Sequence, residues 1–141
     1  MPGGSTCRWM RPVAALLMLS NRATSWARGP STSREIKRPW EVGKAFAASA
    51  PCGRVFPASK IGHPDKGAIW LDVNGERKQS ADVQDLIWNI PETIEHLSAL
   101  FTLEPGDLIY TGTPAGVGPI KPGDVMHGFV EGVGEITTKV V

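Results

Sequence analysis

The sequence predicts one α+β domain in which β-strands dominate and a single amphipathic helix is present. Three observations lead to this fold class. Asn74-Gly75 separates two short segments of strand-forming residues, a pattern typical of a two-residue β-hairpin turn. Residues 92–101 repeat apolar side chains at helical spacing, and residues 107–141 hold three more strand-like segments divided by glycine and proline. A chain of 141 residues with 41% apolar and 21% charged residues can bury one ordinary core.

The first half of this domain is expected to consist of loops and the hairpin. Residues 39–57 mix small, apolar and turn-forming residues, which predicts a loop lying across the core. Residues 60–66 are expected to form a polar turn. The two strands of the hairpin are predicted at residues 68–73 and 76–79. A turn or two of helix is predicted over residues 82–88, ending before Pro91 because proline disfavours helical angles in the preceding residue.

The second half contains the amphipathic helix and the remaining strands. Pro91 suits the first turn of a helix, and with its apolar stripe this helix is expected to run to about Thr102. Three polar side chains that resemble a metal-ligand cluster lie opposite the apolar stripe, so a solvated face is the better interpretation. These side chains are Glu92, Glu95 and His96. Strands are predicted at residues 107–111, 124–130 and 134–141, the last with the alternation of a half-buried strand.

The charge distribution divides the chain into two parts. Residues 1–38 hold seven Lys or Arg and one acid, whereas the remainder holds eight Lys or Arg and thirteen acids. The acidic remainder offers no basic face, so nucleic acid is not an expected partner. Residues 1–34, rich in Ser, Arg, Gly and Pro, are expected to be a poorly ordered basic leader, and residues 35–141 the domain.

Two features bear on location. The apolar run from Val13 to Leu19 is much shorter than the ~20 residues that span a bilayer, so no membrane segment is expected. The two cysteines form no CxxC pair and no disulfide framework, which favours a reducing, cytoplasmic setting. The Arg- and Ser-rich leader has some character of a mitochondrial presequence, which is the weaker alternative.

The most informative segment is residues 103–118, LEPGDLIYTGTPAGVG. A short apolar strand leading into a glycine-rich turn leaves backbone N–H groups accessible at a rigid support, which predicts a lip that binds an anion such as a carboxylate or phosphate. No Gly-Lys-Ser/Thr follows the glycines, so this is not a Walker phosphate loop, and Pro119 prevents the helix that a dinucleotide fingerprint requires. A tight connection between two strands remains an alternative interpretation.

The order of several motifs resembles the C-terminal half of the fumarylacetoacetate hydrolase family, especially its short acylpyruvase and fumarylpyruvate hydrolase-like members. These motifs are PWEVGKAF, VNGE, IPETIEHLS, LEPGDLIYTGTPAGVG and KPGDVMHG, and they extend over about residues 35–141. The resemblance implies a β-rich α+β fold, usually dimeric, that binds Mg²⁺ or Mn²⁺ and cleaves a carbon–carbon bond in 1,3-dicarbonyl acids. Related members decarboxylate oxaloacetate.

The resemblance also assigns site residues. Lys44 matches the family's active-site lysine, whose ammonium faces the dicarbonyl oxygens; from the residues alone, a solvated lysine or one paired with Glu41 is the better interpretation. Gly112 and Thr113 match the turn that holds the substrate carboxylate through a backbone N–H and the threonine hydroxyl. The expected partner is therefore a small-molecule dicarbonyl acid.

The metal ligands that the resemblance implies are not found in this sequence. In the family, a Glu-x-Glu pair, an aspartate and a water-activating His-Glu pair all precede the lysine. Here Glu35 and Glu41 are the only acids before Lys44, no histidine precedes it, and no Glu-x-Glu occurs anywhere. Because hard divalent ions need several oxygen ligands, no metal ligand is assigned, and the chain is expected to be a truncated enzyme without its metal-binding half.

Two alternatives stay open at this point. One is a noncatalytic remnant, a module that binds a carboxylate or that dimerises, either with itself or with a homologue, through exposed strand edges. The other is a lyase similar to oxaloacetate decarboxylase.

Overall fold

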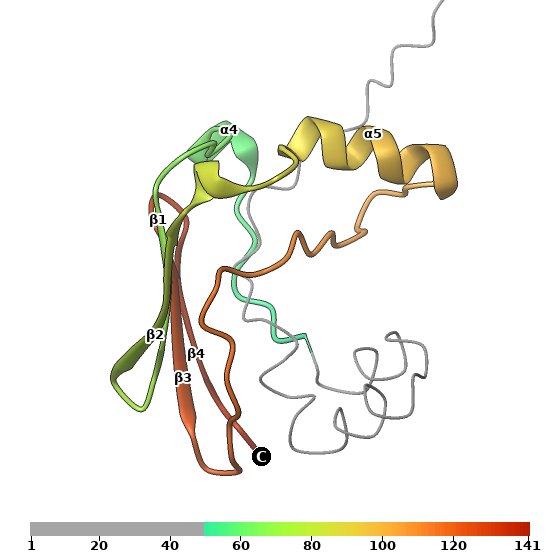
Figure 1. The fold of residues 1–141 in the computed structure, drawn as a ribbon. Coiled ribbons are helices and arrows are strands. Elements are labelled where there is room, and N and C mark those ends of the chain that lie inside the picture. Colours follow the sequence, from blue (N-terminus) through green and yellow to red (C-terminus); the bar gives the residue numbers. More distant parts are fainter. Residues whose placement is uncertain (1–49) are drawn as a thin grey trace, which may run out of the picture.

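Residues 50–141 are described by a computed structural model of the chain, and they fold around a four-stranded antiparallel sheet (Figure 1). The strands are β1 (Ala68–Val73), β2 (Glu76–Asp82), β3 (Val125–Val130) and β4 (Gly134–Lys139), arranged in the order β2-β1-β3-β4. The helical elements are α4 (Ala58–Ile61), the 3-10 turn η1 (Val83–Asp85) and α5 (Ile90–Leu100). The expected β-dominant α+β class is confirmed.

The hairpin predicted from Asn74-Gly75 is confirmed. Asn74 and Gly75 have φ angles of 52° and 80°, and two successive positive values define the turn whose twist matches that of the flanking strands. Strand β2 pairs with β1 and continues to Asp82, beyond the predicted end at Gln79.

A β-bulge interrupts the pairing of β1 with β2. Leu71 lies opposite Gln79, whereas the next residue, Asp72, lies opposite Arg77, so Lys78 is an extra residue without a partner in this ladder. Directly opposed side chains project from the same face of a sheet. The bulge therefore places Gln79 on the face of Leu71 and Arg77 on the face of Asp72.

One face of the sheet forms the core. The side chain of Met126 is the most buried at 1% exposure. It packs with Leu71, Ile120 and Val140, and a second cluster forms around Val130. Ile120 comes from outside the sheet, so the segment that precedes β3 closes over this face.

The opposite face carries an aromatic and charged cluster. Trp70 stacks on Phe129 with ring centroids 5.1 Å apart. The Arg77 guanidinium lies 3.9 Å from the centroid of the Trp70 ring and pairs with Asp72. These contacts cover the sheet with the apolar stem of arginine and the flat faces of aromatic rings.

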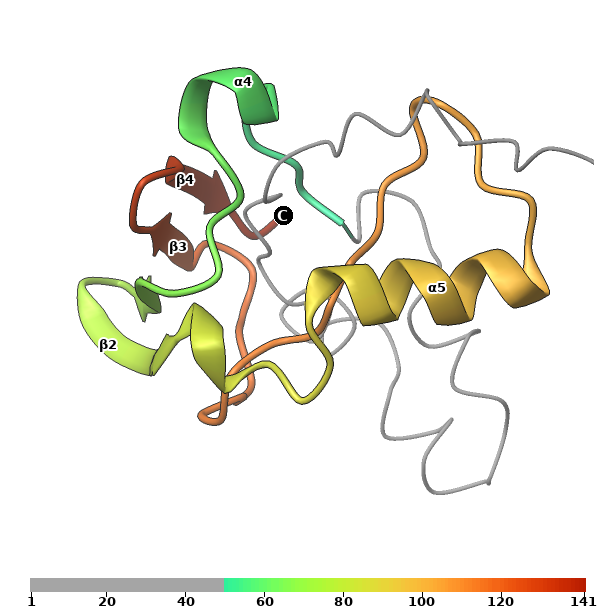
Figure 2. The same cartoon turned by 90° about the horizontal axis from the view of Figure 1, so that it is seen from above.

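Helix α5 lies to the side of the sheet, as Figures 1 and 2 show. Asn89 caps it by accepting from the Glu92 N–H at 2.9 Å, while the Glu92 carboxylate accepts from the Asn89 N–H at 2.9 Å. The predicted amphipathic helix is confirmed, although it ends at Leu100 rather than at Thr102. Within residues 50–141, neither this helix nor any other has the length and apolar character needed to cross a bilayer.

Three local predictions differ from the structure. The turn or two of helix expected over residues 82–88 is present only as the single 3-10 turn η1, and the first residues of the turn expected at 60–66 belong to α4. Residues 107–111 form no strand. A strand needs a neighbour to satisfy its backbone groups, and this segment joins no ladder among the described residues. Instead, residues 101–124 return from α5 to the sheet as irregular chain (Figure 1). The leader expected at residues 1–34 lies outside the described residues.

Candidate functional site

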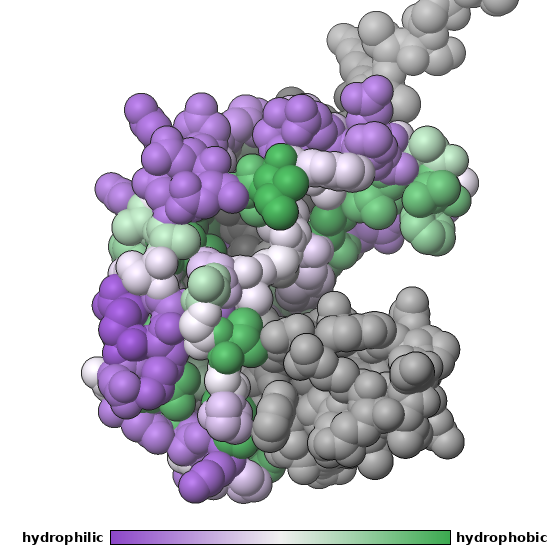
Figure 3. Space-filling view, viewed as in Figure 1, coloured by the Kyte–Doolittle hydropathy of each residue, from purple (hydrophilic) through white to green (hydrophobic). Residues whose placement is uncertain are grey.

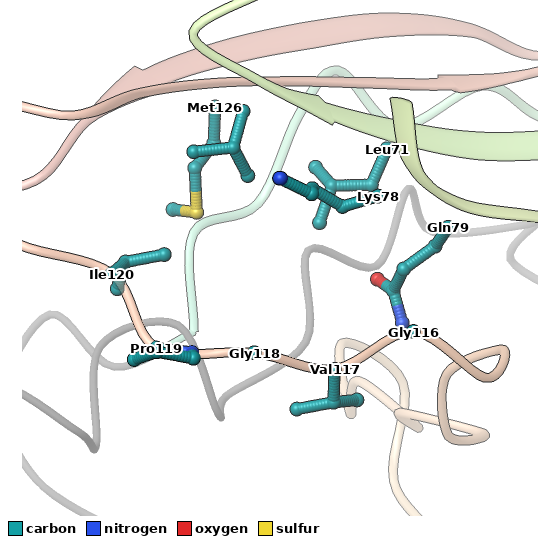
Figure 4. A pocket seen from close by; sticks show the side chains of 10 residues that line it. Leu71, Lys78, Gln79, Gly116, Val117, Gly118, Pro119, Ile120 and Met126 are labelled. Carbon is teal, nitrogen blue, oxygen red and sulfur yellow. The ribbon is translucent and has the colours of Figure 1, made fainter. Parts of the chain in front are cut away.

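The glycine-rich turn at residues 111–118 lies beside strand β2 rather than at the end of a strand (Figure 4). Gly112 and Thr113 are both exposed, so a ligand can reach them. Gly112 has a φ of 112°, and a Cβ built on it would meet no atom within 4 Å. The backbone at Gly112 therefore presents an open side to solvent, in a conformation that favours glycine. The turn keeps the accessibility expected of an anion-binding lip, but β2 supports it.

Gln79 of strand β2 fastens the turn. Its side chain is buried, with 5% exposure. The amide nitrogen Nε2 donates to the Thr113 hydroxyl oxygen at 3.0 Å and to the Pro114 carbonyl oxygen at 2.7 Å. A primary amide has two protons, so it can make both hydrogen bonds at once. The sequence alone does not identify Gln79 as a site residue, because the face of the sheet on which its side chain lies depends on the bulge at Lys78.

Gly116 brings the turn into direct contact with the bulge. A Cβ on Gly116 would overlap the carbonyl oxygen of Lys78 and lie 3.1 Å from its carbonyl carbon. The φ of Gly116 is 99°, a value that side-chain-bearing residues rarely adopt. Only glycine allows the turn to approach β2 this closely.

A small hollow separates the turn from the sheet (Figure 4). It holds about 50 Å³ and is lined mainly by apolar side chains, among them Leu71, Val117 and Met126. A water molecule needs a cavity of about 10–15 Å³, so the hollow has room for a few waters and not for a dicarbonyl acid. The Lys78 ammonium also borders the hollow and is paired with Glu76 at 2.6 Å.

Tyr110 ties the chain before the turn to residue 50. Its hydroxyl donates to the Ala50 carbonyl oxygen at 3.2 Å. Burial raises the pKa of Tyr110, with a smaller contribution from the nearby Cys52 side chain. The phenol therefore stays protonated and remains a donor at neutral pH.

The residues that could hold a metal do not come together in the described part of the chain. Among residues 50–141 there is no group of three or more His, Cys, Asp or Glu side chains that could hold a metal ion. Glu92 caps α5, and His127 pairs with Glu135 at 3.1 Å. The interpretation of Glu92 as a surface residue is consistent with this. Residues 50–141 do not, by themselves, fit a divalent metal ion, because too few oxygen ligands converge. Lys44 lies outside the described residues, and its role stays a prediction.

Comparison with known proteins decides the family. The family model described as the fumarylacetoacetate (FAA) hydrolase C-terminal domain matches residues 15–141. The chain belongs to the fumarylacetoacetate hydrolase family. The resemblance inferred from the motifs around the turn is thereby confirmed. The match begins inside the stretch expected to be a leader, and the division of the chain at residue 34 stays a prediction.

Two curated relatives show the extent of the similarity. The chain is 46% identical to the fumarylpyruvate hydrolase of a Ralstonia species over 108 residues, which are 77% of this chain and 56% of that protein. It is 43% identical to the human mitochondrial oxaloacetate tautomerase FAHD1 over 144 residues, which cover 97% of this chain and 64% of that protein. The chain therefore spans somewhat more than half the length of these two members of the fumarylacetoacetate hydrolase family.

Solved structures of the family share the fold. The fumarylpyruvate hydrolase of Pseudomonas aeruginosa, in complex with Mn²⁺ and pyruvate, is 51% identical with a TM-score of 0.74, over 78% of this chain and 47% of that one. A fumarylpyruvate hydrolase from Burkholderia cenocepacia, described as putative, has the same TM-score of 0.74 at 43% identity, over 78% of this chain and 49% of that one. Both similarities cover about half of the longer proteins.

Proposed function

We propose that the chain serves in the hydrolysis of a carbon–carbon bond in 1,3-dicarbonyl acids of the acylpyruvate or fumarylpyruvate type. The observation that carries the proposal is the exposed Gly112-Thr113 turn, fastened to β2 by Gln79, in a chain 46% identical to a fumarylpyruvate hydrolase. The similarity to a fumarylpyruvate hydrolase in complex with pyruvate supports the same substrate class.

The turn is suited to the carboxylate of such an acid. The exposed backbone at Gly112 and the hydroxyl of Thr113 are neighbouring donors, and nothing within 4 Å of the Gly112 Cβ position blocks approach. Hydrogen bonds to a charged carboxylate are shorter and stronger than those between neutral groups. Lys44 is proposed to face the dicarbonyl oxygens and stabilise negative charge that develops there.

The metal is the part of this proposal that residues 50–141 do not supply. Mn²⁺ is present in the Pseudomonas aeruginosa complex and in that of the maleylpyruvate hydrolase from Sphingobium sp. SYK-6, and Mg²⁺ or Mn²⁺ is the expected cofactor of the family. Because no group of potential ligands converges among residues 50–141, the role proposed for this part of the chain is confined to binding and orienting the substrate carboxylate. The alternative of a noncatalytic carboxylate-binding module stays open.

Oxaloacetate is a second candidate substrate. The observation in its favour is the similarity to the human oxaloacetate tautomerase, which extends over 97% of this chain. Oxaloacetate is itself a dicarbonyl acid with a carboxylate beside a ketone. The Gly112-Thr113 turn would bind that carboxylate in the same way, so tautomerisation and decarboxylation of oxaloacetate are both compatible with the turn.

The proposed assembly is a homodimer or a pair with a homologue. Strands β2 and β4 each have one neighbour within the described sheet, and unpaired strand edges invite further pairing. Apolar side chains also gather at the end of α5 (Figure 3), where Leu100 and Phe101 are 75% and 62% exposed. Light scattering of the purified chain tests this assembly, because a strict monomer at all concentrations would contradict it.

The proposed location is the cytoplasm or, as in the name of the human relative, the mitochondrion.

The test of the proposed function is an assay of the full chain with fumarylpyruvate and oxaloacetate. We expect negligible turnover with added Mg²⁺ or Mn²⁺, and turnover of fumarylpyruvate when a fragment of a relative that contains its Glu-x-Glu segment is mixed in. Thr113→Val should abolish that turnover and Thr113→Ser should keep it, because serine retains the hydroxyl. Lys44→Ala should reduce it as well.

Each outcome of this assay separates the candidates. Turnover that Thr113→Val leaves unchanged would contradict the site. Pyruvate binding that requires Thr113, without turnover in any mixture, would favour the noncatalytic module. Conversion of oxaloacetate in preference to fumarylpyruvate would favour the second substrate.

A further inference from the structure

We propose that Gln79 is a positioning residue that directs the hydroxyl proton of Thr113 toward a bound carboxylate. The inference deepens the proposed function, because it assigns the group that prepares the turn for its ligand. Gln79 would not touch the acid itself. It would act through the Thr113 hydroxyl, to which its amide donates at 3.0 Å.

The orientation of the Gln79 amide follows from Pro114. The Pro114 carbonyl oxygen lies 2.7 Å from Nε2 of Gln79, and this oxygen can only accept. If the amide were rotated by half a turn, its own oxygen would face another acceptor. Since an amide with 5% exposure cannot exchange these partners for water, the nitrogen is held toward the turn.

This orientation determines the role of the Thr113 hydroxyl. One Nε2 proton is donated to Pro114 and the other to the Thr113 oxygen at 3.0 Å, so the hydroxyl acts as an acceptor toward Gln79. Its own proton is then available to a ligand. The competing arrangement, in which Thr113 donates to Oε1 of Gln79, has the longer distance of 3.2 Å. A carboxylate that accepts the proton would favour the first arrangement further.

The bulge at Lys78 is the structural device that makes this contact. Because Lys78 has no partner in β1, Arg77 and Gln79 lie on opposite faces although they are two residues apart. Gly116 then packs against the carbonyl of Lys78, which places Thr113 within reach of Gln79. The bulge therefore has two effects: it directs the Gln79 amide toward the turn, and it allows the turn to pack against β2.

The test is a pyruvate titration of the full chain and its variants, followed by NMR of the Gly112 and Thr113 amides. Gln79→Glu keeps the shape of the side chain, but a carboxylate can only accept, so it would take the Thr113 proton. We expect its pyruvate affinity at pH 7 to be at least about tenfold lower than that of the wild type, the loss typical of a charge-assisted hydrogen bond. Gln84→Glu makes the same chemical change at an exposed position and should bind as the wild type does.

The pH dependence separates positioning from a merely structural role. As the pH falls, the carboxylate introduced by Gln79→Glu becomes protonated and can donate again, so the pyruvate affinity of this variant should rise toward that of the wild type. The Gln84→Glu control should show no such recovery. An affinity of the Gln79→Glu variant that equals the wild type at pH 7, or that is reduced equally at every pH, would overturn the proposal.

A measurement on the wild type decides the question if Gln79→Glu does not fold. Both side-chain amide protons of Gln79 should exchange slowly with solvent, since both are donated to acceptors on the turn and the amide is buried. Rapid exchange of either proton would overturn the proposal. If the wild type does not bind pyruvate at all, the proposed function fails, whereas the exchange of these protons still shows whether Gln79 donates to both oxygens.

Discussion

Substituting Gly116 by alanine tests whether the glycine-rich turn is fastened to strand β2. The new Cβ would overlap the Lys78 carbonyl oxygen and lie 3.4 Å from the Gln79 Cγ, at a φ of 99°. A side chain at such an angle costs about 1–3 kcal/mol. Displacing packed backbone adds about 1–3 kcal/mol. We therefore expect the free energy of unfolding to fall by about 2–6 kcal/mol, a large share of the ~5–15 kcal/mol typical of a domain.

Urea unfolding measures this loss. With a slope of about 2 kcal/mol per molar urea, the midpoint should fall by about 1–3 M. Amide exchange at residues 112–118 should also become faster, because relief of the overlap pulls the turn away from β2. Both effects follow from the same contact.

Gly118→Ala is the matched control. It lies in the same turn, but its Cβ would meet no atom within 4 Å and its φ is not in the positive range. We expect its stability to equal that of the wild type or to rise by up to about 1 kcal/mol, because alanine reduces the freedom of the unfolded chain. Equal stability and equal amide exchange in the two variants would refute the packing of Gly116 against Lys78.

Two further perturbations test the core and its electrostatics. Met126→Ala removes a side chain with 1% exposure and should lower the free energy of unfolding, measured in urea, by about 2–5 kcal/mol. Val125→Ala changes a residue that is 41% exposed and should alter the free energy of unfolding by no more than about 0.5 kcal/mol. Equal losses in the two variants would contradict the assigned core. Hydrogen bonds from the N–H group of Gln84 and, second, from that of Gly67 hold the pKa of Asp82 below its ordinary value of 3.8. Its carboxylate therefore stabilises the fold above pH 3.8. This contribution to the free energy of unfolding is lost as the pH falls through the folded-state pKa. Asp82→Asn should therefore be less stable than the wild type at neutral pH, and a difference in urea midpoint that did not narrow below pH 3.8 would contradict this.

Elements whose determinants are local could be predicted from the sequence. The Asn74-Gly75 turn fixes the hairpin through its own two φ angles, whatever the rest of the chain does. Helix α5 likewise begins with a reciprocal cap between Asn89 and Glu92, three residues apart. The exposed Gly112 and Thr113 also follow from a local excess of small residues.

Features that depend on pairing between distant segments could not be predicted. Residues 107–111 have the composition of a strand, but Tyr110 bonds to Ala50 and no ladder forms among the described residues. Regular alternation would place Gln79 on the same face as Arg77. The pairing register with β1 instead places Gln79 and Arg77 on opposite faces, and the sequence of β2 alone does not indicate the extra residue. The sequence pattern therefore could not identify Gln79 as the hydrogen-bond partner of Thr113.

The unpaired residue in β2 also limits what a shared motif can tell about a relative. A homologue that keeps TGTP but has a regular hairpin would send the equivalent glutamine to the solvent side of its sheet, and its threonine would lose the amide that holds it. Two chains with identical turns can thus differ in how they receive an acid, according to a one-residue difference in a distant hairpin. Hairpin length is consequently a criterion for transferring this site between sequences.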